Sequence, residues 1–241
     1  MWIDFEKTDG VQLNAPAIVV AVSTSMPQYR ALYSQAREVA TYMLAKMKFE
    51  RIATLRSSSF PPEVLVRDEG ISSLPSCGFH LHRGKRDIVL FAGDTSPMED
   101  QYEFAQFLLG YAQELGVKDL FSIGARWAEN PVPAEAEPQL SGFATDEEGV
   151  RKLADKGIRI LKEEPAPFFS SMIVALAKER SMLGYKLSVD HGEPSPHPRS
   201  VAKILGALAG LAGFEVELKE LSPKAGASAS EGKRPERGIY Q

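Results

Sequence analysis

A continuous apolar run near the N-terminus places the strongest constraint on how this chain can fold. Ala17–Ser23 reads AIVVAVS and contains no charged residue. A strand of this composition is buried on both faces, as in a parallel sheet with helices on either side. Gln28–Lys48 then has apolar residues at helical spacing, and Arg51–Arg56 has the character of the next strand. We therefore expect a β-α-β unit with parallel pairing and a right-handed crossover.

The segments that follow predict antiparallel pairing. Phe79–Arg83 and Asp87–Ala92 are strand-like, and the short segment Gly84–Arg86 between them suits a hairpin turn. Val64–Arg67 is a further short strand-like run. The sheet is therefore expected to be mixed.

A helix with start and stop signals is expected over Met98–Leu115. Thr95 or Ser96 can cap its N-terminus, and Pro97 suits the first helical position. Gly116 can end it in the left-handed conformation.

The second half of the chain continues the alternation. The expected strands are Asp119–Gly124, a short one beginning at Phe143, Ile158–Leu161, Gly184–Val189 and Phe214–Leu218. The expected helices are Glu147–Lys156, Ser170–Met182 and Arg199–Ala212. The predicted fold class is α/β, in three layers, with a mixed, mostly parallel central sheet between helices. Residues 1–221 are expected to form a single domain.

Composition excludes several classes of partner and site. The 28 basic and 32 acidic residues give a net charge of −4, without the basic cluster that nucleic acid or an anionic membrane would need. The single cysteine, Cys77, excludes an intrachain disulfide. The first residues lack a secretory signal, and the longest apolar run, Ile204–Phe214, is too short to span a bilayer. We expect a cytoplasmic protein.

The last twenty residues differ from the rest of the chain. Ser222–Gly238 is rich in Ser, Gly, Ala and Pro and has no large apolar side chain, which predicts a flexible linker. Residues 222–241 are therefore interpreted as a tail. Its final residues, Ile239, Tyr240 and Gln241, restore two large apolar side chains. Capture of a chain end is a known mode of recognition, and tyrosine adds contact area at low entropic cost.

Two segments at predicted strand ends could contribute to a ligand pocket. Gly93 and Asp94 lie between a strand and a helix, where open α/β sheets bind ligands, although Asp94 can equally cap the helix. The segment Asp190–Glu193 includes His191 and Glu193 and could supply a general base or a metal ligand, but its spacing matches no standard metal motif. We therefore expect no metal and no cofactor.

Other polar residues are interpreted as structural. His80 and His82 alternate on one strand and so share a face, for which a solvated polar face is expected rather than a metal site. Ser57–Ser59 lacks the turn of a hydrolase nucleophile, and phosphate-binding glycine loops are absent from the sequence. No catalytic residue is assigned.

Three stretches together carry a resemblance to a known family. They are Ile88–Ala125, Phe143–Ile158 and Gly184–Leu208, within a similarity that extends over most of Ala15–Leu221. In these stretches the chain resembles the proteasome-assembly-chaperone family of archaea and bacteria. The resemblance implies a fold similar to that of nucleoside phosphorylases and a protein that forms homo- or hetero-oligomers, of which we expect a homo-oligomer.

The end of the chain resembles a proteasome-docking motif, which is a hydrophobic residue, a tyrosine and any third residue. Ile239, Tyr240 and Gln241 match it position by position. The resemblance implies that these residues insert between α-subunits of the 20S proteasome ring. The first hypothesis is therefore an ATP-independent chaperone or activator. The alternatives are a phosphorylase- or hydrolase-like enzyme with a pocket near Asp94, His191 and Glu193, and an oligomeric scaffold that does not bind a proteasome.

Overall fold

The computed structural model describes residues 1–22, 30–66, 69–93, 95–127, 137–191 and 198–221. The strands, in chain order, are β1 (Ile3–Lys7), β2 (Ala17–Val22), β3 (Glu50–Ser57), β4 (Leu65–Val66), β5 (Ser72–Ser73), β6 (Cys77–His82), β7 (Ile88–Gly93), β8 (Asp119–Trp127), β9 (Gln139–Ala144), β10 (Arg159–Ile160) and β11 (Leu183–His191). The helices are α1 (Arg30–Lys46), α2 (Gln101–Glu114), α3 (Glu147–Asp155), α4 (Phe169–Glu179), α5 (Pro198–Ala212) and the short 3₁₀ turn η2 (Lys219–Leu221).

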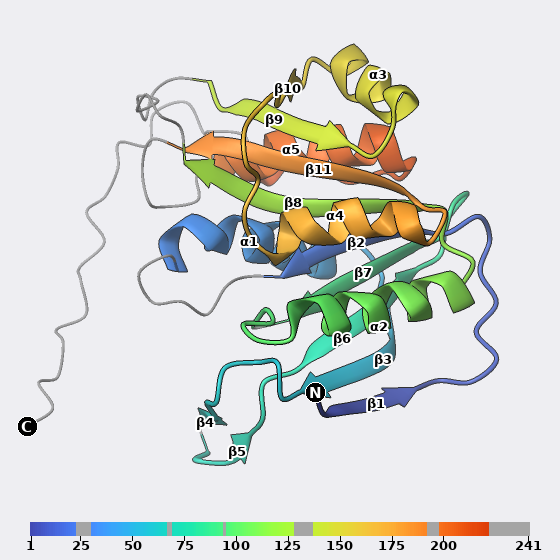
Figure 1. Ribbon diagram of the computed structural model, residues 1–241, viewed down its shortest axis with the longest axis vertical. Helices are drawn as coiled ribbons and strands as arrows, with labels where there is room; N and C mark the ends of the chain where they lie inside the picture. Colours follow the sequence, from blue (N-terminus) through green and yellow to red (C-terminus); the bar gives the residue numbers. More distant parts are fainter. Residues whose placement is uncertain (23–29, 67–68, 94, 128–136, 192–197, 222–241) are drawn as a thin grey trace, which may run out of the picture.

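Nine of these strands form one mixed sheet (Figure 1), in the order β1-β3-β6-β7-β2-β8-β11-β9-β10. The central strands β7, β2, β8 and β11 are parallel to one another. The side from β1 to β7 is antiparallel, and β11 is antiparallel to β9. The predicted α/β class with a mixed sheet is confirmed. The sequence predicts a mostly parallel sheet, whereas four of the neighbouring strand pairs are parallel, at the centre and at the β9–β10 edge, and four are antiparallel. Strands β4 and β5 form a separate ribbon.

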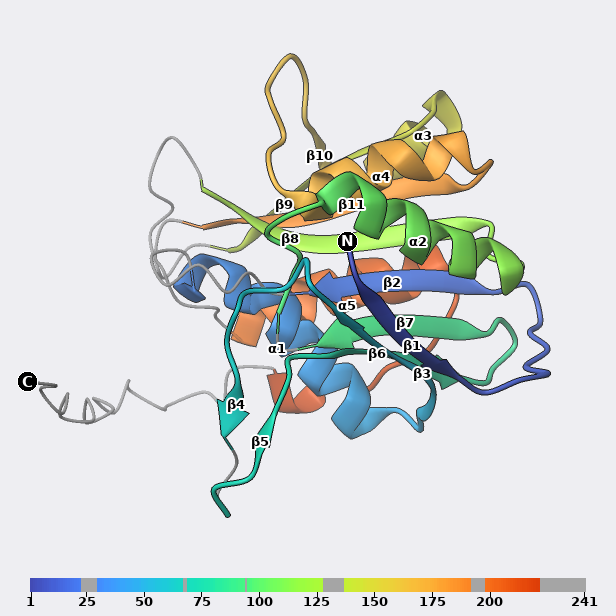
Figure 2. The ribbon, with the colours of Figure 1, turned by 60° about the horizontal axis from the view of Figure 1, so that its bottom comes forward.

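Strand β2 lies at the middle of the sheet and is buried along its whole length. Ala17, Val19 and Ala21 face the core beneath α1 and α5, whereas Ile18, Val20 and Val22 face the core beneath α2 and α4. Figures 1 and 2 show these helix pairs on opposite faces of the sheet, with α3 beside β9 and β10. The expectation of a strand buried on both faces is confirmed.

The expected parallel pairing of Ala17–Ser23 with Arg51–Arg56 is wrong. The second segment, β3, pairs with β1 and β6 in antiparallel fashion, and β2 instead pairs with β7 and β8. Arg51 is exposed and Arg56 is half-buried, where it contacts Asp4 and Glu6 of β1. A strand with two arginines is not suited to the sheet centre, where both faces are covered.

Two other expectations also need correction. The helix expected from Met98 begins instead at Gln101, because the backbone N–H groups of Met98 and Glu99 donate to Ser59 O and Asp100 adopts a left-handed conformation. Thr95 and Ser96 therefore do not cap it. Phe214–Leu218 is not a strand, and Tyr42 Oη donates instead to the carbonyl oxygen of Glu217, at 2.6 Å.

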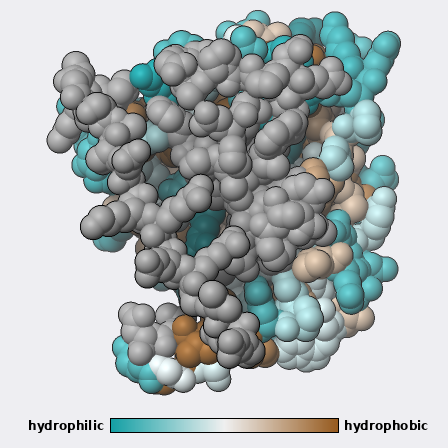
Figure 3. Space-filling model, turned by 90° about the vertical axis from the view of Figure 1, so that its left-hand side faces the viewer, coloured by the Kyte–Doolittle hydropathy of each residue, from teal (hydrophilic) through white to brown (hydrophobic). Residues whose placement is uncertain are grey.

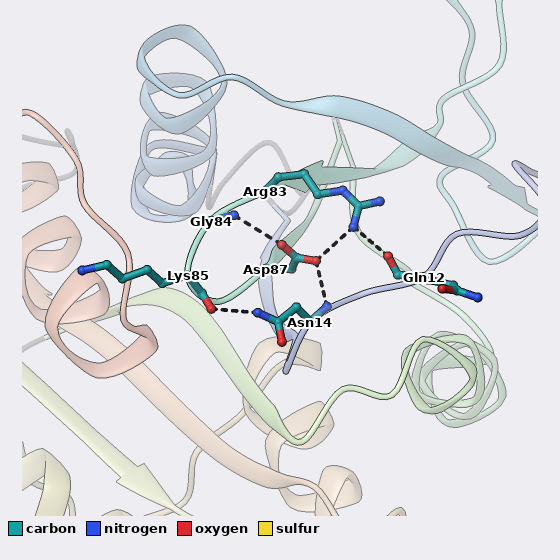
Figure 4. Close-up of polar contacts among 6 residues, drawn as sticks. All are labelled: Gln12, Asn14, Arg83, Gly84, Lys85 and Asp87. Atoms are coloured by element: carbon teal, nitrogen blue, oxygen red, sulfur yellow. Dashed lines mark hydrogen bonds and ion pairs between the residues drawn. The ribbon is translucent and has the colours of Figure 1, made fainter.

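The turn between β6 and β7 is held by a buried carboxylate (Figure 4). Asp87, only 2% exposed, accepts hydrogen bonds from the backbone N–H of Asn14 at 2.9 Å, from Arg83 Nη1 at 3.2 Å and from the N–H of Gly84 at 3.3 Å. Arg83 also donates to Gln12 O at 2.6 Å. Asp87 therefore fixes both the hairpin and the segment that leads into β2.

We expect the substitution Asp87→Asn to destabilise the fold by about 2–3 kcal/mol, because one amide cannot accept all three hydrogen bonds and the ion pair is lost. The measurement is urea unfolding monitored by circular dichroism. The control Asp155→Asn, at an exposed position of α3, should change stability by less than about 0.5 kcal/mol. Equal effects of the two substitutions would contradict the structural role that we assign to Asp87.

Candidate functional site

The carboxyl ends of the parallel strands lie along one edge of the sheet, where open α/β folds bind ligands. Val22 of β2 pairs with Gly93 of β7, and Trp127 of β8 pairs with His191 of β11. Asp94 follows Gly93 directly and Glu193 follows shortly after His191, but both lie outside the described residues, as does the side chain of His191. The predicted pocket of Asp94, His191 and Glu193 therefore stays a prediction.

Strand β11 has one apolar and one polar face, and both are buried. Tyr185, Leu187 and Val189 pack in the core beneath α1 and α5. Lys186, Ser188 and Asp190 face the opposite side, the side of α4, and are between 2% and 6% exposed. Lys186 is the only lysine that is buried among the described residues, and Ser188 separates it from Asp190 on this face.

Lys186 is the most unusual residue of this face. Its Nζ donates to Ser170 Oγ at 2.8 Å, and Ser122 Oγ donates to the carbonyl oxygen of Ser170 at 2.6 Å. A Cβ at Gly124 would lie 2.4 Å from Lys186 Nζ, so a glycine on β8 makes room for the amine. Within the described ranges no carboxylate forms an ion pair with it, and burial lowers the pKa of Lys186 to about 7. An amine of this kind is neutral in a large fraction of molecules at physiological pH.

Asp190 forms ion pairs with two arginines. Its carboxylate oxygens lie 2.6 Å from Arg159 Nη2 and 3.6 Å from Arg126 Nη1, and Ser141 Oγ donates to it at 2.7 Å. Arg126 also pairs with Glu164. This network joins β8, β9, β10 and β11 to the segment before α4. Because its oxygens are occupied, Asp190 has a structural role here rather than that of a general base.

The two histidines of β6 differ from the expected solvated face. His80 is buried, against Gly78, and burial together with the positive charge of Arg51 lowers its pKa to about 4. His82 is half-buried, and its Nδ1 lies 3.0 Å from the carbonyl oxygen of Lys48. The solvated face is therefore wrong for His80. In the ranges that the structure describes, no group of three His, Cys, Asp or Glu residues could hold a metal ion.

The remaining sequence candidates have structural contacts. Ser57 Oγ donates to Trp2 O and accepts from the backbone N–H of Ser59, and Cys77 is buried in β6. No helix among the described residues is long and apolar enough to cross a membrane.

The root of the C-terminal tail is fixed to the α1–α5 face. Lys46 Nζ lies 2.6 Å from Glu220 Oε2, and the Tyr42 hydroxyl is bonded to Glu217 O. Leu221 lines a groove of about 220 Å³ together with residues of α1 and α5 that include Tyr42 and Val201. The predicted docking residues Ile239, Tyr240 and Gln241 lie outside the described residues. The last described residues, up to Leu221, therefore lie against α1 and α5.

Comparison with known proteins gives a family match over most of the chain. A family model described as the PAC2 family matches residues 36–233. A curated relative, the uncharacterized protein MJ1210 of Methanocaldococcus jannaschii, is 24% identical over 124 residues. That match covers 51% of this chain and about half, 47%, of the relative.

Solved structures with the same fold include three relatives at low sequence identity. Pyrococcus furiosus PbaB, an archaeal proteasome activator, has a TM-score of 0.77 at 18% identity, covering 91% of this chain and 92% of PbaB. P. furiosus PbaA, an archaeal homologue of proteasome-assembly chaperone, has a TM-score of 0.71 at 18% identity, covering 91% and 89%. The Mycobacterium tuberculosis proteasome-assembly chaperone homologue Rv2125 has a TM-score of 0.71 at 17% identity, covering 85% and 89%.

The burial of Lys186 predicts how the stability of the fold depends on pH. Between about pH 7 and pH 10 the unfolded chain still binds a proton at Lys186 that the folded protein has released, so stability rises with pH. Below about pH 7 both states are protonated and the penalty for burying the charge is constant. We expect Lys186→Met to remove this dependence, which is on the order of 4 kcal/mol over the interval.

The measurement is the free energy of unfolding at several pH values from 6 to 10. Because other groups titrate equally in both proteins, the difference between wild type and Lys186→Met isolates the lysine. Lys203→Met, at an exposed position of α5, is the control and should follow the wild-type curve. Parallel curves for wild type and Lys186→Met would disprove that folding lowers the pKa of Lys186.

Proposed function

The chain belongs to the PAC2 family, and from this we propose that it is an ATP-independent chaperone or activator that binds the α-ring of the 20S proteasome through its C-terminal tail. We further propose that residues 1–221 form one folded domain, that residues 222–241 act as a tether, and that the protein is a homo-oligomer. Ile239, Tyr240 and Gln241 are the proposed docking residues.

The family and the fold support a proteasome-related role. The PAC2 model covers residues 36–233. Two structures with the same fold over 91% of this chain are described as a proteasome activator and as a homologue of proteasome-assembly chaperone. This agreement between family and fold is the observation that carries the proposal.

The geometry of the tail root supports docking by the tail. The contacts of Lys46 and Tyr42 hold residues 217–220 against α1. Beyond Leu221 the chain has 20 further residues, with a composition that predicts an unstructured tether. Such a tether spans roughly 25 Å on average and at most about 65 Å, which is enough to reach a pocket on a neighbouring particle.

An oligomer would strengthen this docking. A three-residue segment forms few contacts and binds weakly by itself. Several tails on one assembly raise the local concentration of docking segments and can increase the overall affinity by orders of magnitude. The proposal thus requires no nucleotide and no catalytic step. The enzyme alternative, with its pocket near Asp94, His191 and Glu193, stays a prediction, because those side chains lie outside the described residues.

We expect the substitution Tyr240→Ala to reduce binding of the full chain to purified 20S proteasome by at least about tenfold, because the tyrosine supplies most of the contact area of the docking segment. Binding is measured by surface plasmon resonance on immobilised 20S particles, with hydrolysis of a fluorogenic peptide as a second readout.

The control for this experiment is Ser230→Ala, which changes the tether and leaves the last three residues intact. A chain lacking Ile239–Gln241 should behave like Tyr240→Ala. Undiminished binding by that truncated chain would refute docking through the tail.

A further inference from the structure

The exposed apolar side chains of this molecule gather at one end. Of the ten large apolar side chains that are exposed among the described residues, eight belong to the residues before β1, the β4–β5 ribbon with its flanking residues, and the N-terminal end of α2 with the turn before it. They are Met1, Trp2, Val64, Val66, Ile71, Leu74, Met98 and Tyr102. The concentration of so many in three neighbouring segments indicates an interaction surface.

The β4–β5 ribbon, which we call the arm, carries most of its exposed apolar side chains on one face. Leu65 pairs with Ser73 and Val66 pairs with Ser72, so the alternation of side chains places Val64, Val66 and Leu74 on the same face. These three are 59%, 66% and 52% exposed. Ile71 is equally exposed but lies on the opposite face, with Ser73.

The arm does not pack on the body of its own chain. Among the described elements, β4 and β5 have substantial contacts only with each other, and Figures 1 and 2 show them extending away from the sheet. Brown, hydrophobic surface is visible at this end in the space-filling view (Figure 3). A two-stranded ribbon with an exposed apolar face is only marginally stable in water, so a covering surface is expected.

A second apolar surface, which we call the base, lies where the arm joins the body. The N–H of Trp2 donates to Ser58 Oγ at 2.8 Å, and the N–H of Met98 donates to Ser59 O at 2.7 Å. These bonds place the backbones of Trp2 and Met98 against the loop that leads into the arm. Tyr102, 63% exposed, follows one turn later in α2. The base therefore consists of Trp2, Met98 and Tyr102.

We propose that the arm of one copy of this chain packs its Val64–Val66–Leu74 face on the base of a second copy, and that the second copy does the same in return. The inference rests on the proposed function only in taking the protein to be a homo-oligomer. It makes no use of proteasome binding.

The presence of both surfaces on one chain favours a second copy as the occupant. Because the arm extends away from the body, it does not cover its own base, whereas a reciprocal exchange covers both surfaces of both copies. The six side chains expose on the order of 100 Å² each, or about 600 Å² per copy. That is the apolar share expected for a homodimer interface of roughly 900 Å² per partner.

The test is sedimentation velocity of the full chain over a range of micromolar concentrations. Wild type should sediment as an oligomer. We expect the double substitution Val66→Asp and Leu74→Asp to weaken self-association on the order of 100-fold, because it buries two carboxylates in an apolar contact. Ile71→Asp, on the other face of the same ribbon, is the matched control and should remain oligomeric.

A crosslinking experiment identifies the partner surfaces directly. Chains with Val66→Cys and chains with Tyr102→Cys, carrying different tags, are mixed and treated with a short bismaleimide. A crosslink between the two tags is expected, and Ile71→Cys in place of Val66→Cys should give little. The native Cys77 is 1% exposed and should not react.

Three results would overturn the inference: a monomeric wild type, an oligomer that survives the double substitution, or the absence of a crosslink between arm and base. A monomeric wild type would assign the arm to a different protein. Because the tail is unchanged in every variant, docking to the 20S particle is measured separately, and its failure would leave the sedimentation result unaffected.

Discussion

Burial of β2 on both faces is the constraint on which the rest of the fold depends. Six consecutive residues of this strand are no more than 7% exposed, and they alternate between two separate cores. Neither core can form unless a helical layer covers that face, because an apolar sheet face open to water loses its stabilisation. The pair α1 and α5 supplies one layer and α2 and α4 the other. Asp87 acts at the entrance to this strand by fixing the segment around Asn14.

Local sequence predicted the buried strands well and their partners poorly. Two charged, alternating segments illustrate the difference. Ile3–Lys7 (IDFEK) forms β1, and Phe214–Leu218 (FEVEL) forms no strand, although both alternate apolar and acidic residues. The first has an available edge at β3, and Phe5 packs against Phe107 and Tyr111. The second lies against α1, where the hydroxyl of Tyr42 donates a hydrogen bond to the backbone carbonyl of Glu217. Neighbours distant in sequence decide the outcome, and local sequence does not contain them.

In the candidate site, too, local sequence predicts some features, and others depend on neighbours that are distant in the sequence. Topology alone pointed to Asp94, His191 and Glu193, since strand ends are recognisable in sequence. Nothing in the segment GYKLSVDH indicates that Lys186 is buried, because a lysine in an alternating strand usually faces solvent. Lys186 is buried because Ser170 of α4 covers and binds its amine and because Gly124, on the neighbouring strand β8, leaves room for the side chain. His80 is a parallel case on β6, where Gly78 makes room for the ring.

The tail root and the base lie on different helical layers. Residues 217–221 rest on α1 and α5, whereas Tyr102 belongs to α2 on the other side of the sheet. In the proposed assembly, which is joined at the base, each tail root would lie on the opposite helical layer from the contact between copies. The proposed tether of some twenty residues, for three proposed docking residues, is long enough to reach from that layer to a target shared by several copies.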